Sequence, residues 1–206
     1  RNRVVCIHLL LERLNPMLSY ELFYAVNMSS VIWITGLSGS GKSTLAQAVH
    51  NELMNVRPRS SVFLDGDELR KLFAVYGENS EYSEVQRVEY AKKYSLLCKM
   101  LAEQGIIVII ATISLYSQIH EWNRKNLPNY FEILIEANIE TLKRRDPKGI
   151  YKRFMCGELI NVSGLDLEVD MPCSPDHVLL AETNYNCESE ACSIVSRVMR
   201  LIQNEN

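Results

Sequence analysis

This sequence lacks several features that mark particular classes of protein. Its 206 residues contain no apolar run long enough to span a bilayer, so we expect no membrane association. Basic residues are not in excess, because 22 lysines and arginines against 25 acidic residues give a formal net charge of −3, and we expect no nucleic-acid partner. Repeats and low-complexity segments are also missing. With 47% hydrophobic and 23% charged residues, the composition is that of one compact globular domain.

The six cysteines lack the spacing of a metal site or a disulfide framework. None forms a C-x-x-C pair, and no His/Cys cluster has zinc spacing. Cys98 lies in an apolar helical pattern, which is typical of a buried thiol. Scattered cysteines of this kind favour a reducing compartment, and we expect the protein to be cytoplasmic. A disulfide between Cys187 and Cys192 is the disfavoured alternative.

The first 27 residues fit no clear element. Residues 4–11 are apolar, but the run is short, Glu12 and Arg13 follow it, and no convincing small-residue cleavage site comes next, which argues against a signal peptide. Met28 stands directly before the first strand-like run. We therefore expect an N-terminal extension over residues 1–27, outside the domain, and a functional domain over residues 28–206.

One stretch organises the rest of the chain. Residues 36–44, GLSGSGKST, fit the phosphate-binding pattern G-x-x-x-x-G-K-[ST], between an apolar strand-like run and an amphipathic helical pattern. Glycines let the backbone curl around phosphate oxygens, while loop N–H groups and the helix N-terminus present partial positive charge. Lys42 adds a full charge toward the β- and γ-phosphates, and the Ser43 hydroxyl suits Mg²⁺. We expect ATP contacts from the P-loop residues Gly36, Ser38, Gly39, Ser40, Gly41, Lys42, Ser43 and Thr44.

Strand-like and helical patterns alternate along the whole domain. Strands are predicted at residues 31–35, 61–64, 106–111, 130–136 and 177–181. Helices are predicted from the P-loop to about residue 55 and at 68–73, 84–104, 117–125, 139–145 and 188–203, with loops at 76–83 and 161–175. Asp146 before Pro147 resembles an N-cap, so we expect a further basic helix from there to about Cys156. The alternation predicts a three-layer α/β P-loop NTPase fold, a parallel sheet flanked by helices with ligands at the carboxyl ends of its strands.

The second strand ends in a group of charged residues, Asp65-Gly66-Asp67-Glu68-Leu69-Arg70. Phosphoryl transfer needs one carboxylate near the hydrated Mg²⁺ and one that accepts the proton of the attacking hydroxyl. Asp65 and Asp67 supply two such carboxylates, with Asp65 the candidate for the metal, and Arg70, one helical turn on, can reach an anionic acceptor. A solvated turn with a helix cap is the alternative interpretation.

Taken together, the motifs resemble the adenylylsulfate kinase (APS kinase) family. Asp65-Gly-Asp67-x-x-Arg70 matches D-G-D-x-x-R, and residues 145–152, RDPKGIYK, resemble R-D-x-K-G-L-Y-K. Residues 113–116, ISLY, resemble I-S-P-Y, and residues 163–166, SGLD, resemble T-G-I-D. The similarity extends from about Val31 to the C-terminus, and the later motifs are more specific than the P-loop.

The resemblance implies an ATP-dependent kinase that phosphorylates the 3′-hydroxyl of adenosine 5′-phosphosulfate (APS). Mg²⁺ would accompany ATP, and Asp67 would be the base that accepts the proton of the attacking hydroxyl. Lys148 would lie near the transferred phosphate, and Arg144 or Arg145 would clamp a mobile lid over the nucleotide. The family is commonly dimeric, so a homodimer is expected from the resemblance alone. The implied acceptor-binding residues are Asp67, Arg70, Tyr82, Arg87, Tyr90, Ile113, Ser114, Lys148 and Val162.

Departures from the family pattern leave the acceptor open. Tyr82 stands where the family has one adenine-stacking phenylalanine, Val162 where it has a second, and Tyr90 near an expected asparagine. Some relatives phosphorylate other nucleotides, and cytidine diphosphoramidate in capsule synthesis is the main alternative to APS. A 5′-hydroxyl polynucleotide kinase fits the acidic pI of about 5.9 poorly. A non-catalytic nucleotide-binding module would not need Lys42, Ser43, both aspartates and Lys148 together.

Overall fold

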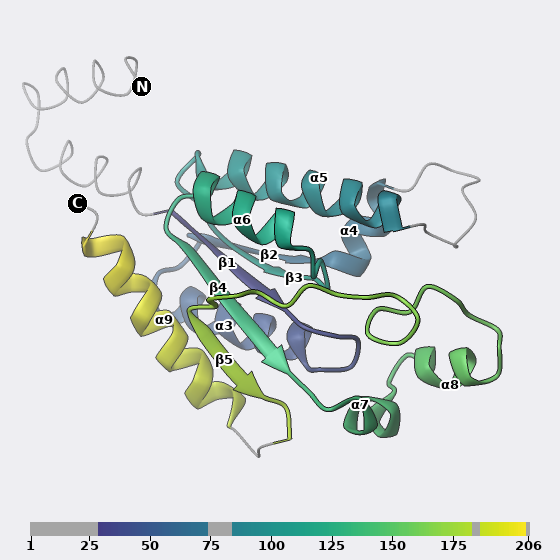
Figure 1. The fold of residues 1–206 in the computed structure, drawn as a ribbon. Coiled ribbons are helices and arrows are strands. Elements are labelled where there is room, and N and C mark those ends of the chain that lie inside the picture. The colour runs from purple at the N-terminus through teal and green to yellow at the C-terminus, as the bar shows by residue number, and fades with distance from the viewer. Residues whose placement is uncertain (1–28, 74–83, 183–185, 205–206) are drawn as a thin grey trace, which may run out of the picture.

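Within residues 29–73, 84–182 and 186–204, which the computed structural model describes, five strands form one parallel sheet (Figure 1). Their order is β2-β3-β1-β4-β5, which places the strand before the P-loop at the centre. The carboxyl ends of the strands all meet at one edge of the sheet. The strands are β1 (Ser30–Thr35), β2 (Ser61–Asp65), β3 (Ile107–Ala111), β4 (Tyr130–Glu136) and β5 (His177–Leu180).

Helices cover both faces of this sheet (Figure 1). The first layer is α3 (Lys42–Val56) with α9 (Cys187–Asn204), and the second is α4 (Gly66–Phe73), α5 (Glu84–Ala102) and α6 (Ser117–Asn126). Two short helices, α7 (Ile139–Arg145) and α8 (Ile150–Met155), lie beyond the carboxyl ends of the strands. The three-layer α/β fold expected from the sequence is confirmed. None of the described helices is long and apolar enough to cross a membrane.

The two core layers explain why the strands are continuously apolar. In β1, Ile32 and Ile34 pack toward α3 and α9, while Val31 and Trp33 pack toward α5 and α6, and all four side chains are fully buried. Because neighbouring residues point to opposite faces, a strand covered on both sides needs apolar side chains at every position. This arrangement holds the P-loop rigidly at the end of β1.

A third apolar cluster lies at the carboxyl edge of the sheet, under α7 and α8. It joins the P-loop, the segment after β3, β4, both short helices and the loop that follows them. Its buried members are Leu37, Leu115, Leu134, Leu142, Tyr151 and Val162. The P-loop, the segment after β3 and the region of α7 and α8 therefore share one packed core.

The predicted helix start at Asp146 is wrong by one turn. Asp146 follows the end of α7 instead, and its N–H donates to the carbonyl oxygen of Leu142. Helix α8 begins only at Ile150, because the preceding Gly149 has a φ of +65°, which is not helical. The carboxylate of Asp146 nevertheless accepts the N–H groups of Tyr151 and Lys152, at 3.2 and 2.9 Å. The residue does cap the basic helix, but from a turn away.

The end of α5 and the state of the cysteines agree with the sequence predictions. Gly105 follows α5 with φ of +84°, as expected for a helix stop. Cys187 and Cys192 are free thiols, so the alternative of a disulfide is excluded, and Cys98 is buried, which raises the pKa of its thiol. The predictions for residues 1–27 and for the loop at 76–83 lie outside the described residues.

Candidate active site

The P-loop follows β1 and closes against the end of β4. Gly36 has φ of +147°, and a Cβ atom there would lie 2.5 Å from the carbonyl oxygen of Ile135. Only glycine therefore fits at this position. The loop ends at Gly41, the N-cap of α3, so that the loop N–H groups and the helix N-terminus face the same space. This is the anion-binding geometry that the motif predicts.

Lys42 lies half-buried at the start of α3. Its ammonium donates a hydrogen bond to the carbonyl oxygen of Leu37 at 2.7 Å, which folds the side chain back over the loop. Burial, with the nearby charge of Lys148, lowers the pKa of Lys42 to about 8. A cation desolvated in this way interacts strongly with a phosphate that replaces the lost water.

Asp65 connects the P-loop to the start of α4. Its Oδ2 accepts the Ser43 hydroxyl at 2.7 Å, and its Oδ1 accepts the N–H of Asp67 at 2.9 Å. Among the described residues no three His, Cys, Asp or Glu side chains cluster as a complete metal site. One carboxylate beside one hydroxyl, with phosphates supplying other ligands, is nevertheless how proteins commonly hold Mg²⁺. Ser43 and Asp65 therefore fit the predicted metal.

Asp67 lies between two cations from different parts of the chain. Arg70 Nη2 is 3.1 Å from its Oδ1, and the ammonium of Lys148, before α8, pairs with its Oδ2. Burial alone would raise the pKa of Asp67, but the hydrogen bond from Lys148 and the charge of Arg70 hold it below its ordinary value. The carboxylate is thus ionised at neutral pH and can accept a proton or orient a hydroxyl.

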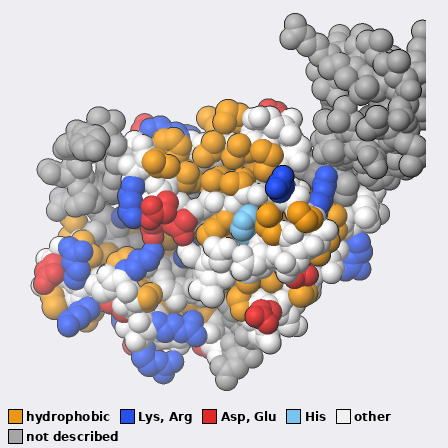
Figure 2. Space-filling model, turned by 180° about the vertical axis from the view of Figure 1, so that it is seen from behind, with side chains coloured by type: hydrophobic (Ala, Val, Ile, Leu, Met, Phe, Trp, Pro, Cys, Tyr) orange, Lys and Arg blue, Asp and Glu red, His pale blue; other side chains and the backbone are white. Residues whose placement is uncertain are grey.

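The segment around α8, which we call the lid (residues 146–165), rests on the P-loop. The hydroxyl of Tyr151, whose ring is fully buried, donates to the carbonyl oxygen of Ser38 at 2.9 Å. A Cβ atom at Gly39 would lie 3.4 Å from Pro147. Basic side chains gather at this end of the molecule, toward the lower left in Figure 2, and they include Lys143, Arg144, Arg145, Lys152 and Arg153. A local positive field therefore exists despite the negative net charge.

A small polar cavity lies beside Asp67, between α4, α5 and the segment after β3. We call it the tyrosine pocket. Its volume is about 30 Å³. Its lining residues are Arg70, Arg87, Tyr90, Tyr94, Thr112, Ile113, Ser114, Tyr116 and Ser163. Five residues that the resemblance assigns to the acceptor therefore converge here, although they span more than forty positions of the sequence.

Four pocket residues were not predicted from the sequence as part of a site. Tyr94 lies one helical turn after Tyr90, and their rings stack with centroids 6.5 Å apart, a spacing that could have indicated a shared face. Tyr116 and Ser163 belong to the family-like motifs ISLY and SGLD, whereas Thr112 belongs to no motif and its position in the sequence did not indicate a site. Thr112 Oγ1 and Ser114 Oγ lie 2.8 Å apart, which holds two hydroxyls at the pocket wall.

Other predicted site residues lie outside this pocket. Val162 is buried in the third apolar cluster beside Leu37. Arg145 donates to the carbonyl oxygen of Ala181 at 2.5 Å, just after β5. Arg87, by contrast, lines the pocket, and it also donates to the carbonyl oxygen of Asn161 at 2.8 Å. Tyr82 lies outside the described residues. The acceptor and ATP roles of these side chains stay predictions.

The geometry thus combines a phosphate-binding loop, a hydroxyl and carboxylate for Mg²⁺, an ionised aspartate and a lid lysine. A model of the adenylylsulphate kinase family matches residues 28–180. This chain belongs to the adenylylsulphate kinase family. It is accordingly an ATP-dependent kinase, as the sequence predicted.

Relatives in this family carry two different names. Cytidine diphosphoramidate kinase of Campylobacter jejuni is 38% identical over 172 residues, which cover 84% of this chain and 98% of that protein. Adenylyl-sulfate kinase of Pseudomonas aeruginosa is 36% identical over 149 residues, covering 71% of this chain and 74% of that protein. A solved Mycobacterium tuberculosis APS kinase, in complex with AMPPNP and APS, superposes with a TM-score of 0.72 at 28% identity, covering 84% of this chain and 98% of that one. Membership of the family therefore does not by itself select the acceptor.

Proposed function

We propose that this kinase transfers the γ-phosphate of ATP to a ribose hydroxyl of cytidine diphosphoramidate. The transfer itself is supported by the closeness of Lys42, Asp67 and Lys148, since Lys148 pairs with Asp67 and both charges act on the ammonium of Lys42. APS is the second candidate, because relatives named for it have comparable identity.

In the proposed reaction, Asp67 accepts the proton of the attacking hydroxyl as its oxygen bonds to the γ-phosphorus and the bond to the β-phosphate oxygen breaks. Lys42 stabilises the charge on the transferred group from the P-loop side, and Lys148 stabilises it from the lid side. Ser43 and Asp65 would hold Mg²⁺, which neutralises phosphate charge when bound. Lid residues over the P-loop exclude water and limit hydrolysis of ATP.

The choice of acceptor depends on one observation above all. By the resemblance, Val162 stands where the family has its second adenine-stacking ring, and this side chain is buried in the third apolar cluster and offers no aromatic face. A purine that binds between two aromatic rings would have only one ring to stack on. Each aromatic pair contributes about 0.5–1.5 kcal/mol beyond the effect of buried area, so this loss would weaken purine binding. The smaller pyrimidine of a cytidine nucleotide loses less contact. The extent of similarity to the Campylobacter jejuni enzyme supports the same choice.

Purified protein with Mg-ATP and each acceptor in turn tests the proposal. We expect ADP release and a phosphorylated product, seen by mass spectrometry, with cytidine diphosphoramidate and at least tenfold lower kcat/KM with APS. An Asp67→Asn variant is the control for catalysed transfer. Preference for APS would select the second candidate, and turnover of neither would refute both. The homodimer and the cytoplasmic location stay predictions from the resemblance and the cysteine content.

A further inference from the structure

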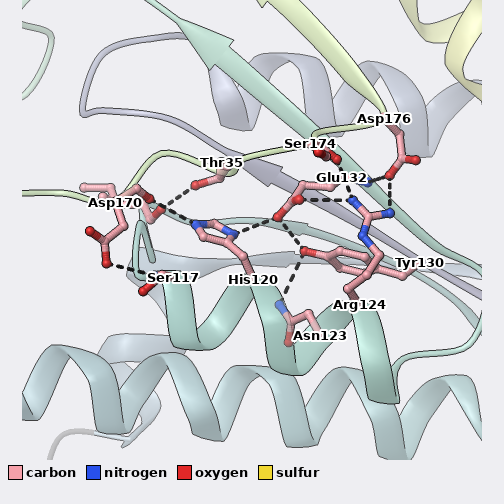
Figure 3. Close-up of polar contacts among 11 residues, drawn as sticks. Thr35, Ser117, His120, Asn123, Arg124, Tyr130, Glu132, Asp170, Ser174 and Asp176 are labelled. Atoms are coloured by element: carbon pink, nitrogen blue, oxygen red, sulfur yellow. Dashed lines mark hydrogen bonds and ion pairs between the residues drawn. The ribbon is translucent and has the colours of Figure 1, made fainter.

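A buried polar cluster lies between α6 and β4, and the proposed transfer does not use it (Figure 3). Its centre is Glu132 of β4, which is 3% exposed. The Tyr130 hydroxyl donates to Glu132 Oε1 at 2.8 Å, and Arg124 Nη2 lies 3.2 Å from Oε2. His120 Nδ1 lies 2.7 Å from the same Oε1. The carboxylate of Glu132 thus acts as an acceptor for side chains from α6 and β4.

The second ring nitrogen of His120 also faces an acceptor. Its Nε2 lies 3.3 Å from the carbonyl oxygen of Asp170. A neutral imidazole has one donor and one acceptor nitrogen, so both contacts are hydrogen bonds only when the ring carries two protons. We propose that His120 is a positioning residue, and that its imidazolium form clamps residues 168–176, the strap between lid and β5, against the wall of the tyrosine pocket.

Asp170 transmits this clamp to the pocket. Its N–H donates to the carbonyl oxygen of Leu115 at 3.0 Å, and its Oδ2 accepts the N–H of Ser117 at 3.0 Å. The bond from Ser117 also lowers the pKa of Asp170, so that its carboxylate stays an acceptor. Between these two anchors lies Tyr116, which lines the pocket. Holding Asp170 therefore fixes the backbone on both sides of a pocket residue.

Loss of one proton from His120 breaks the clamp at a defined point. The remaining proton stays on Nδ1, because the bond to the Glu132 carboxylate is charge-assisted and stronger. The Nε2 lone pair then faces the Asp170 carbonyl oxygen, and two acceptors repel. The other end of the strap is held independently, since Arg124 Nη1 bonds Asp176 at 2.7 Å. The effect is thus confined to the part of the strap around Asp170, which is bonded to Leu115 and Ser117 on either side of a pocket residue.

His177 offers a matched control within the same chain. Its Nε2 lies 3.3 Å from Glu190 Oε2, an acceptor, but its Nδ1 lies 3.0 Å from Arg197 Nη1, a donor. A neutral ring satisfies both contacts. His177 joins β5 to α9 and does not line the pocket. Replacing it tests for general effects of removing a partly buried histidine.

Kinetics with His120→Gln and His177→Gln in the full chain test the inference, which rests on the proposed function for the identity of the acceptor. Glutamine does not titrate and cannot donate in both directions. We expect His120→Gln to raise KM for the acceptor about tenfold with KM for ATP unchanged, as loss of a charge-assisted bond implies. His177→Gln should match the wild type. Equal changes in both KM values, or a similar effect of His177→Gln, would overturn the positioning role.

Two measurements without any acceptor separate this inference from the proposed function. Nitrogen NMR of the histidine rings should show both ring nitrogens of His120 protonated under the conditions of the kinetic assay, and an unprotonated ring nitrogen there would overturn the proposal. Amide exchange at Ser117 and Asp170, corrected for intrinsic rates, should quicken in His120→Gln relative to the wild type. Unchanged exchange would refute the clamp even if the kinase turned over its acceptor as proposed.

Discussion

The hydrogen bond between lid and P-loop leads to a prediction that can be worked through in detail. Tyr151 is 1% exposed, and its hydroxyl donates to the carbonyl oxygen of Ser38 at 2.9 Å. Burial raises its pKa to about 12, so the hydroxyl stays a donor throughout the neutral range. Tyr151→Phe removes only this oxygen and leaves the ring in the apolar cluster. A neutral hydrogen bond contributes about 0.5–1.5 kcal/mol, so we expect the free energy of unfolding to fall by about 1 kcal/mol.

The same change should weaken ATP binding. The bond holds the P-loop backbone beside the phosphate-binding N–H groups, and about 1 kcal/mol corresponds to roughly fivefold in affinity. We expect this loss in the dissociation constant for ATP, measured by titration calorimetry, and a similar rise in KM. Urea titration of the same sample gives the stability change.

Tyr130→Phe is the control for this experiment. Its hydroxyl is also buried and donates to Glu132 at 2.8 Å, but it lies away from the P-loop. It should lower stability by at least as much and leave ATP affinity unchanged. If Tyr151→Phe loses stability but binds ATP like the wild type, the bond supports the fold alone and the link between lid and P-loop is refuted.

Three further predictions follow from the site. Lys42→Ala and Asp67→Asn should each abolish transfer in a radiolabelled ATP assay while circular dichroism stays unchanged; near-normal turnover in Asp67→Asn would remove Asp67 from the base role. Because the pKa of Lys42 is lowered to about 8, its charge is present below that pH and lost above it, so kcat/KM for ATP should fall about tenfold per pH unit beyond pH 8. The pKa of Asp67 is depressed by Lys148 and Arg70, so the acidic limb should lie below the pH at which an ordinary aspartate takes up a proton. Gly164→Ala should destabilise the chain by about 1–3 kcal/mol in urea, because φ is +83° and a Cβ atom would lie 2.9 Å from Leu37.

The strands and the P-loop were predictable because each depends on a local signal. A strand buried on both faces must be apolar throughout, and the run at residues 106–111 shows this directly. The helix start at Asp146 was not predictable from the local rule. There the cap and proline pattern competes with a turn at Gly149, whose positive φ delays the helix until the Asp146 carboxylate reaches its N–H groups. The local pattern correctly predicted that Asp146 caps the basic helix, but it placed the start of that helix one turn too early.

The pocket was only partly predictable for a different reason. Arg70, Arg87 and Ser114 come from motifs, but the wall that Ser163 completes forms only when the lid loop folds back over the segment after β3. No spacing in the sequence encodes that approach, because it depends on packing between segments some fifty residues apart. The polar cluster around Glu132 could not be predicted from the sequence for the same reason. In the sequence Glu132 is one polar residue in an apolar strand, and its partners on α6 and the strap become visible only in three dimensions.

The packing also constrains how acceptor choice could change. Val162 belongs to the apolar cluster that includes Leu37 of the P-loop and Tyr151 of the lid. A larger ring at position 162 must displace neighbours on the ATP side before it can offer a face to the acceptor, and overpacking a filled core costs about 1–3 kcal/mol. With the proposed role of Val162 in acceptor choice, specificity for the acceptor and the placement of the P-loop are coupled through one cluster. A change of acceptor in this chain requires compensating changes at Leu37 or in the lid, and a single substitution at position 162 should lower ATP affinity before it improves stacking.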